Sequence, residues 1–299
     1  MAKTPKPPAP KAPLTDGDIA TCITDYLDNR DDFELELFAY RTLLEHGITA
    51  RHSGTYVDVA TTKARQFDLR AASSIPYHGS ALVIRMAIEC KSLSREFPLV
   101  LSRVPRAKED SYHQVIRFRA QAGAGTQFRG IHQSPSYASV YPTNDMVAKQ
   151  TSQIRCDGTP TPASGADRDT YDKWAQALAS ADELIHLCSF GHRGRVIGVA
   201  EEWDLILPVL VVNDGTLWAV DYDHDGNRAP PKIINDSTLF VARSYDFRDG
   251  YGGEYSISHV HIFTRSGFAK FCAELARDES LLFAGAFADA IQPLPPPTR

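Results

Sequence analysis

The stretch ALVIRMAIECK, residues 81–91, constrains the fold of this chain more than any other part of the sequence. Its run of apolar and β-branched residues is typical of a long strand. Side chains in a strand alternate between the two faces, so Glu89 and Lys91 point one way while Ile88 and Cys90 point the other. We therefore expect one face of this strand to be core and the other to carry charge.

Length and composition place the chain among ordinary globular proteins. It has 299 residues and a formal net charge of -5, which predicts one large domain over residues 15–290. The Pro/Lys-rich residues 1–14 and the Pro-rich residues 291–299 are predicted to be disordered tails. The five cysteines lack CxxC spacing, which argues against a disulfide framework and a multi-cysteine zinc site. No apolar stretch has the length of a membrane span, so we expect no membrane partner and a cytoplasmic location.

Hydrophobic periodicity predicts a mixed α/β domain. The segment 105–169 reads as a long insertion without regular structure, apart from helical spacing over 144–155. The segment 205–223 reads as a hairpin that turns at Asp214-Gly215. The remaining expected helices cover 15–30, 31–47, 171–188 and 265–278, and the remaining expected strands cover 54–60, 64–71, 81–91, 97–104, 238–247 and 255–264.

Asp68 lies on the strand that precedes the AIECKS stretch. If residues 77–80 form the turn between the two strands, Asp68 pairs with Glu89, because residues that pair across a fixed turn keep a constant index sum. Two like charges in this position destabilise a sheet unless a cation lies between them. Two carboxylates with room for water suit Mg²⁺ or Mn²⁺. Lys91, on the same face, is placed to orient an attacking water or to neutralise charge on a phosphorus atom.

These residues resemble the PD-(D/E)XK nuclease superfamily. Asp68 is followed after twenty residues by Glu89-Cys90-Lys91, both motifs lie on strands, and a helix carrying Glu precedes them. Phe67 stands where the superfamily name has Pro. The resemblance implies a mixed β-sheet flanked by helices with a restriction-endonuclease-like core (αβββαβ), the insertion at about 105–169 after the third core strand, and extra strands toward the C-terminus.

The same resemblance assigns roles to individual residues. It implies that Asp68 and Glu89 bind the divalent metal, that Lys91 assists the attacking water, and that a Glu of the first helix supports the site. Glu36 has a spacing before Gly47 similar to that of Mrr-like nucleases, and Glu34 is the alternative. The resemblance further implies that 144–155 is a helix near the site, with phosphate contacts from Lys149 and Gln153.

A local basic excess between residues 103 and 129 is the sequence feature that suggests a nucleic-acid path on an acidic chain. Guanidinium groups suit phosphates, and the interspersed aromatic residues can stack on bases. A surface loop that is basic by chance is an equal interpretation. The candidate contacts here are Arg103, Arg106, Lys108, Arg117 and Arg119.

The sequence thus predicts a Mg²⁺-dependent endonuclease that acts on DNA rather than RNA. The resemblance suggests a role in prokaryotic defence against foreign DNA, with specificity supplied by a homodimer or a partner protein. One alternative is a catalytically silent nucleic-acid-binding or scaffold subunit of the same fold. Another is a metal-dependent hydrolase that uses His259 and His261 together with His192 or Cys188.

Overall fold

The computed structural model describes residues 14–58, 62–77, 80–120, 127–156, 161–162, 166–190, 201–247 and 253–277. The predicted tails therefore lie outside the described residues, apart from Leu14. The helices are α1 (Asp16–Arg30), α2 (Asp32–Glu45), α3 (Ala166–Phe190) and α4 (Arg265–Ala276), with short 3₁₀ helices at Lys108–Asp110 and Ser136–Ala138. The strands are β1 (Thr49–Asp58), β2 (Lys63–Tyr77), β3 (Ser80–Lys91), β4 (Leu99–Pro105), β5 (Gln114–Ala120), β6 (Gln127–Gln133), β7 (Met146–Arg155), β8 (Thr161–Pro162), β9 (Glu201–Val212), β10 (Leu217–Asp221), β11 (Lys232–Ile233), β12 (Asp236–Phe247) and β13 (Gly253–Thr264).

The chain divides into two compact units, residues 1–31 and 32–299. The first contains α1, which begins at a capping box. The Thr15 hydroxyl accepts the Asp18 N–H, and the Asp18 carboxylate accepts the Thr15 N–H. This reciprocal pair satisfies two backbone donors that a helix start leaves unpaired, and the helix predicted over 15–30 is confirmed.

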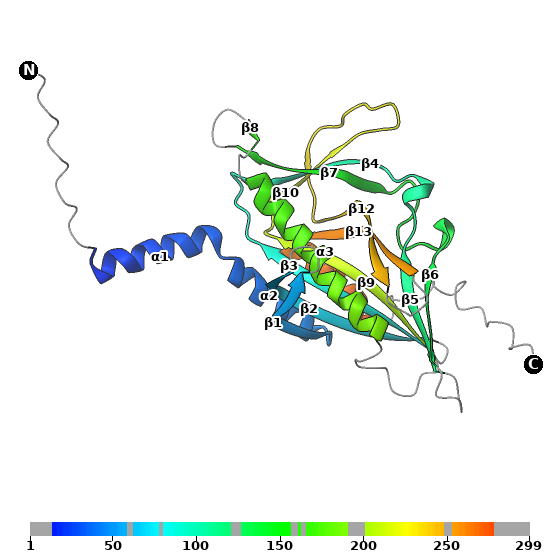
Figure 1. Cartoon of the computed structure of the whole chain (residues 1–299). Helices are drawn as coiled ribbons and strands as arrows, with labels where there is room; N and C mark the ends of the chain where they lie inside the picture. Colours follow the sequence, from blue (N-terminus) through cyan, green and yellow to red (C-terminus); the bar gives the residue numbers. More distant parts are fainter. Residues whose placement is uncertain are drawn as a thin grey trace, which may run out of the picture. The chain divides into compact units, whose positions relative to one another are not determined.

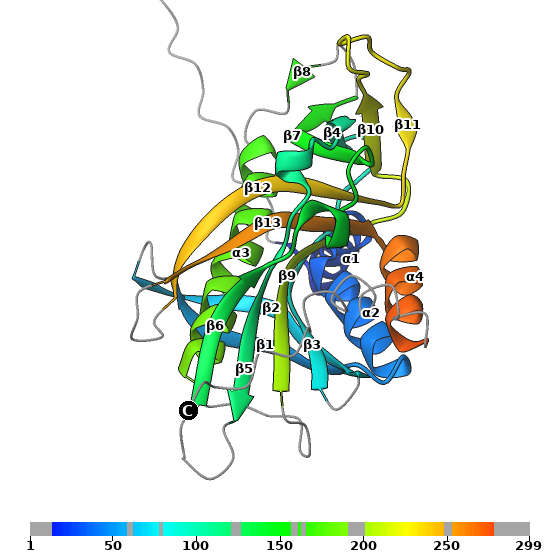
Figure 2. The same ribbon diagram turned by 90° about the vertical axis from the view of Figure 1, so that its right-hand side faces the viewer.

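The second unit is built on a large mixed sheet (Figure 1). Its strands follow the order β1-β2-β3-β9-β13-β12-β7-β4-β10-β11. The first three are joined as antiparallel hairpins, and β9 lies parallel to β3 along its whole length. The sheet forks at β9, because β13 pairs with the end of this strand while β5 pairs with its beginning. Figure 2 shows β5 and β6 running beside β9, below the arc of β12 and β13.

Helices cover both faces of the part of the sheet formed by β1, β2, β3 and β9. On one face, Leu35 and Leu43 of α2 pack in a cluster with Ile88 of β3 and with residues of α4. On the other face, α3 packs against Ala87 and Leu210. The alternation expected for β3 thus places one side of the strand under α2 and the other under α3. The predicted α/β architecture, a mixed sheet flanked by helices, is confirmed.

Three predictions about the elements are wrong. Within the segment 144–155, residues Met146–Arg155 form the strand β7 and not a helix, because β7 pairs with β4 over most of its length. The predicted irregular insertion contains the hairpin β5–β6 and the strand β7. The turn at Asp214-Gly215 does form, with a positive φ of 77° at Gly215, but β9 and β10 are not a hairpin, since β10 pairs parallel with β4.

Within the described ranges, no helix combines the length and the apolar character that crossing a bilayer requires.

Candidate active site

Asp68 and Glu89 meet where the ladder between β2 and β3 ends. The strands pair from Tyr77 opposite Ser80 up to Leu69 opposite Ile88, so the register predicted from the turn is confirmed and its next step joins Asp68 to Glu89. At this step the Cys90 N–H donates to Asp68 Oδ2 over 2.8 Å. The carboxylate of Asp68 therefore takes the place of a ladder carbonyl, directly beside Glu89.

Both carboxylates are removed from water. Glu89 is 0% exposed and Asp68 is 8% exposed. Glu89 lies on the face of β3 that α3 covers. Ala87, two residues earlier on the same face, and Leu210, the β9 partner of Glu89, both belong to the cluster that packs against α3. A carboxylate in such a place requires hydrogen-bonded or cationic company.

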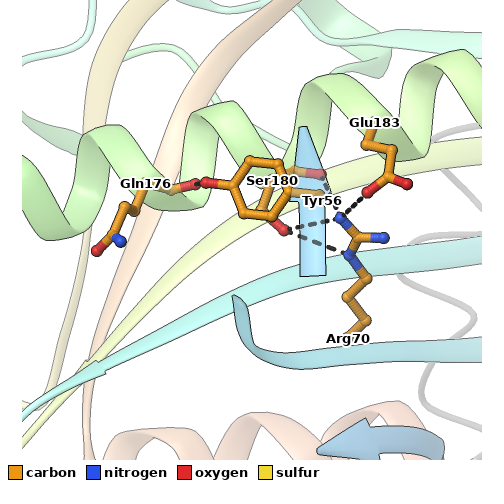
Figure 3. Close-up of polar contacts among 5 residues, drawn as sticks. All are labelled: Tyr56, Arg70, Gln176, Ser180 and Glu183. Atoms are coloured by element: carbon orange, nitrogen blue, oxygen red, sulfur yellow. Dashed lines mark hydrogen bonds and ion pairs between the residues drawn. The ribbon is translucent and has the colours of Figure 1, made fainter. Parts of the chain in front are cut away.

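Tyr56 of β1 interacts electrostatically with Glu89. Burial raises the pKa of the Tyr56 hydroxyl, and the negative charges of Glu89 and Asp58 raise it further. The hydroxyl donates to the Gln176 carbonyl of α3 over 3.5 Å, so Tyr56 also lies on the α3 side of the sheet (Figure 3). Tyr56 is thus part of the surroundings of Glu89, and the sequence analysis did not identify it.

Arg70 lies two residues after Asp68 on β2 and is fixed by α3. Its guanidinium binds Glu183 Oε2 at 2.5 Å and Ser180 Oγ at 3.3 Å, as Figure 3 shows. The same group lies over the ring of Phe67 at 4.2 Å. The position of Arg70 close after Asp68 was the sequence signal that could have identified it.

Lys91 lies at the end of β3 and is held by the start of α2. Its Nζ is 3.5 Å from Asp32 Oδ2, and Asp32 Oδ1 accepts the Ser92 N–H. Asp32 therefore fixes the end of the β3 strand, a role that the sequence analysis missed. No local sequence signal identifies this contact, because Asp32 and Ser92 are 60 residues apart.

The two candidate glutamates of α2 point to other partners. Glu36 Oε2 is 2.9 Å from His52 Nε2, on β1 opposite Leu69. Leu69 belongs to the cluster under α2, which places Glu36 on the opposite side of the sheet from the side of Glu89. Glu34 forms an ion pair with Arg265 of α4 at 3.0 Å.

The candidate nucleic-acid contacts of β4 and β5 do not form one exposed surface. Arg103 is buried and binds Asp221 at 2.7 Å. Arg106 is buried as well, and Arg117 forms an ion pair with Glu201. Lys108 and Arg119 are exposed.

Lys149 and Gln153 lie on β7 instead of on a helix beside the site. In the sheet order β7 is four strands away from β3, about 19 Å at the usual strand spacing. Lys149 Nζ binds Asp110 Oδ2 at 2.6 Å, and the Gln153 amide donates to the Phe97 carbonyl over 2.9 Å. The predicted grouping of these two residues with Asp68 and Glu89 is therefore corrected.

His259 and His261 occupy one face of β13, as expected, and both contact Tyr141. Burial, with help from the charge of Arg106, lowers the pKa of His259 to about 2 and that of His261 to about 4. Of the partners suggested for them, His192 lies outside the described residues, and Cys188 lies beside Asp204.

Asp68 and Glu89 supply carboxylate oxygens, the donor type that a hard divalent cation prefers. Within the part of the chain that the structure describes, no group of three or more His, Cys, Asp or Glu side chains is arranged to hold a metal. Mg²⁺ does not require such a group, because it is commonly bound by one or two carboxylates with water and substrate oxygens completing its shell.

Comparison with known proteins gives no assignment: no family model, no curated protein and no solved structure matches this chain.

Proposed function

We propose that this chain is a metal-dependent nuclease that hydrolyses phosphodiester bonds of DNA, and that it is a PD-(D/E)XK protein. The observation that carries the proposal is the pair of buried carboxylates, Asp68 and Glu89, at the end of the β2–β3 ladder, with Lys91 two residues further on. The order α2, β1, β2, β3 and then, after the intervening strands β4–β8, α3 and β9 supports it, because β9 lies parallel to β3.

The chemistry follows from the residue types. A bound Mg²⁺ would act as a Lewis acid on the phosphoryl oxygens. Asp68 and Glu89 would hold that ion, and the Cys90 N–H keeps the Asp68 carboxylate oriented. Lys91, kept at the strand end by Asp32, would orient the attacking water and neutralise charge that builds on phosphorus.

The test is a cleavage assay with supercoiled plasmid, linear duplex and single-stranded DNA, each with Mg²⁺, Mn²⁺ or EDTA. The wild type should cut only with metal. Glu89→Gln and Lys91→Ala should each lose about 100-fold or more in rate, the range of a lost metal ligand or general acid–base group.

The matched control is Glu202→Gln. Glu202 is also a buried carboxylate, on β9, where it binds Arg85. This variant should retain cleavage once its folded fraction has been checked by circular dichroism. A Glu89→Gln protein that cuts at the wild-type rate would contradict the proposed site.

The complete burial of Glu89 favours a second candidate, a catalytically silent nucleic-acid-binding or scaffold subunit. Cleavage needs substrate at the carboxylates, whereas a binding subunit does not. On this view neither wild type nor Asp68→Asn cuts any of the three substrates, and both retain the same affinity for DNA in a filter-binding assay.

A further inference from the structure

A cavity separate from the candidate active site opens between the end of β4, the segment 140–146, the strands β12 and β13, and α4. Its volume is about 320 Å³. Its lining includes the aromatic residues Tyr141, Phe263 and Phe271. The buried donors Arg106 and Ser237 also line it, and these two residues are here called the floor. Its strands β4, β12 and β13 belong to the half of the sheet beyond β9, away from β2 and β3.

Arg106 is a buried cation that forms no ion pair with an acid among the described residues, although the charges of Asp145 and Asp110 act on it from a distance. It is 3% exposed. Its Nη1 donates to the Pro142 carbonyl over 2.8 Å and its Nη2 donates to Thr238 Oγ1 over 2.7 Å, and both acceptors are neutral. Its Nε is buried and no described residue accepts its proton.

The buried Arg103 and the half-buried Arg85 are both paired with acids. Arg103 binds Asp221 through two nitrogens at 2.7 and 3.1 Å, and Arg85 binds Asp204 at 2.6 Å. Burying a guanidinium away from water without a counter-ion costs free energy, so buried charges are usually paired. Arg106 departs from this pattern, which indicates a missing anion.

The floor of the cavity offers a second donor. Ser237 Oγ is buried and has no hydrogen-bond partner in the described structure. His261 beside it is neutral, since burial and the charge of Arg106 hold its pKa at about 4, and its Nε2 shares a hydrogen bond with the Tyr141 hydroxyl. Arg106 is thus the cationic group of the floor.

The acids and the lysine that line the cavity lie at its rim. Asp145, Asp236 and Glu274 are exposed, and Lys270 lies 3.7 Å from Glu274. Charges at such positions are solvated and screened, whereas the charge on the floor is not. Of these acids, Asp145 acts on Arg106 through its charge but makes no ion pair with it, so the rim leaves the guanidinium without a directly bound anion.

We propose that this cavity binds a small organic oxyanion, with its carboxylate or phosphate group against Arg106 and Ser237 and its apolar part against Phe263 and Phe271. The planar guanidinium suits both head groups. Depth decides against a nucleic-acid backbone, because the 3% exposure of Arg106 leaves it out of reach of a duplex.

The experiment is isothermal titration of the full chain with four probes: benzoate, phenyl phosphate, acetate and inorganic phosphate. The first two should bind saturably and more tightly than the last two, and the tighter of the first two identifies the head group. Arg106→Gln, which keeps amide donors but removes the charge, should weaken binding about 10-fold or more. Ser237→Ala should weaken probe binding by a smaller factor. This variant tests the proposal if Arg106→Gln does not fold.

The control variant is Arg117→Gln, which removes an arginine that is paired with Glu201 outside this cavity. It should bind the probes as the wild type does. The proposal is overturned if no probe binds the wild type, which would leave water as the partner of Arg106. It is also overturned if both cavity variants bind the probes like the wild type.

Discussion

At the scale of single residues, Asp204 is the carboxylate whose ionisation the fold opposes most clearly. Burial raises the pKa of Asp204 to about 6, although Arg85 acts in the opposite direction and the nearby Glu202 adds to the rise. Arg85 lies 2.6 Å from Asp204 and 3.2 Å from Glu202. The guanidinium of Arg85 therefore forms ion pairs with two buried acids. Of these, Asp204 titrates within the range of weakly acidic buffers.

This predicts a pH dependence with a definite sign. Folded Asp204 holds its proton up to about pH 6, whereas the unfolded chain releases it near pH 4. Between these values the folded state binds more protons, so stability falls as pH rises. Asp204→Asn removes this contribution, and the free energy of unfolding of the variant relative to the wild type should rise by about 1–3 kcal/mol from pH 4 to pH 6.5.

Urea denaturation at a series of pH values measures this difference. Comparing the two proteins at each pH cancels the titration of the other carboxylates. A relative stability that stays flat over the interval would mean that Asp204 is ionised throughout.

At the scale of elements, the start of α4 depends on a glycine. The helix is capped by Thr264, whose hydroxyl accepts the Gly267 N–H over 3.2 Å. A Cβ at Gly267 would lie 2.0 Å from the carbonyl oxygen of Asn235. The loop before β12 thus contacts the first turn of α4 with no room for a side chain.

Gly267→Ala should therefore destabilise the protein by about 1–3 kcal/mol, the usual cost of overpacking a well-packed site, despite the better helix propensity of Ala. Gly253→Ala is the control, because a Cβ there meets only Ile131 Cδ1 at 3.4 Å. Thermal unfolding followed by circular dichroism measures both. Equal midpoints for the two variants would show that the loop yields easily.

The error at 144–155 has a specific cause. Opposite Ser102 and Arg103 of β4, the register of β7 shifts by one residue, and Lys149 is skipped. This bulge breaks the two-residue alternation, and the adjacent residues Val147 and Ala148 are both buried. The apolar residues Val147 and Ile154 are seven apart in the sequence, a spacing that also fits a helix. A bulge depends on the partner strand, which periodicity in one segment does not contain.

The hairpin predicted over 205–223 was also wrong because strand pairing depends on distant parts of the chain. Local chemistry predicted the turn correctly, because Gly215 adopts the positive φ that its position requires. Which strands then pair is decided by competition for edges. Both edges of β9 are taken, one by β3 and the other by β13 and β5, and β10 continues to β4.

The candidate active site and the Arg106 cavity also differ in how far local sequence predicts them. The neighbourhood of Asp68 and Glu89 was predictable, since one turn fixes the register of two adjacent strands. The surroundings of Arg106 were not, because Ser237, Phe263 and Phe271 come from elements far along the chain. Its burial in particular depends on packing that no local pattern encodes.

At the scale of the whole unit 32–299, the sheet passes without interruption from β1 to β11 through β9. Leu207 lies in the middle of β9 and is almost fully buried. We expect this unit to unfold in one transition, so that tryptophan fluorescence, from Trp174, Trp203 and Trp218, coincides with circular dichroism.

Leu207→Ala should lower the unfolding free energy by about 2–5 kcal/mol and shift both signals together. Ile233→Ala, at an exposed position of β11, is the control and should change little. Two separated transitions in Leu207→Ala would instead show that the halves of the sheet on either side of β9 unfold independently.

The parallel pairing of β3 with β9 means that β3 is synthesised well before its partner strand. Residue by residue, Ser80 to Lys91 align with Glu201 to Val212, so the partner of each β3 residue follows about 120 residues later. At the usual ribosomal speed this interval lasts on the order of 10 s. During that time β3 presents an unpaired apolar edge on the nascent chain, which is the kind of surface that chaperones shield and with which other nascent chains can pair.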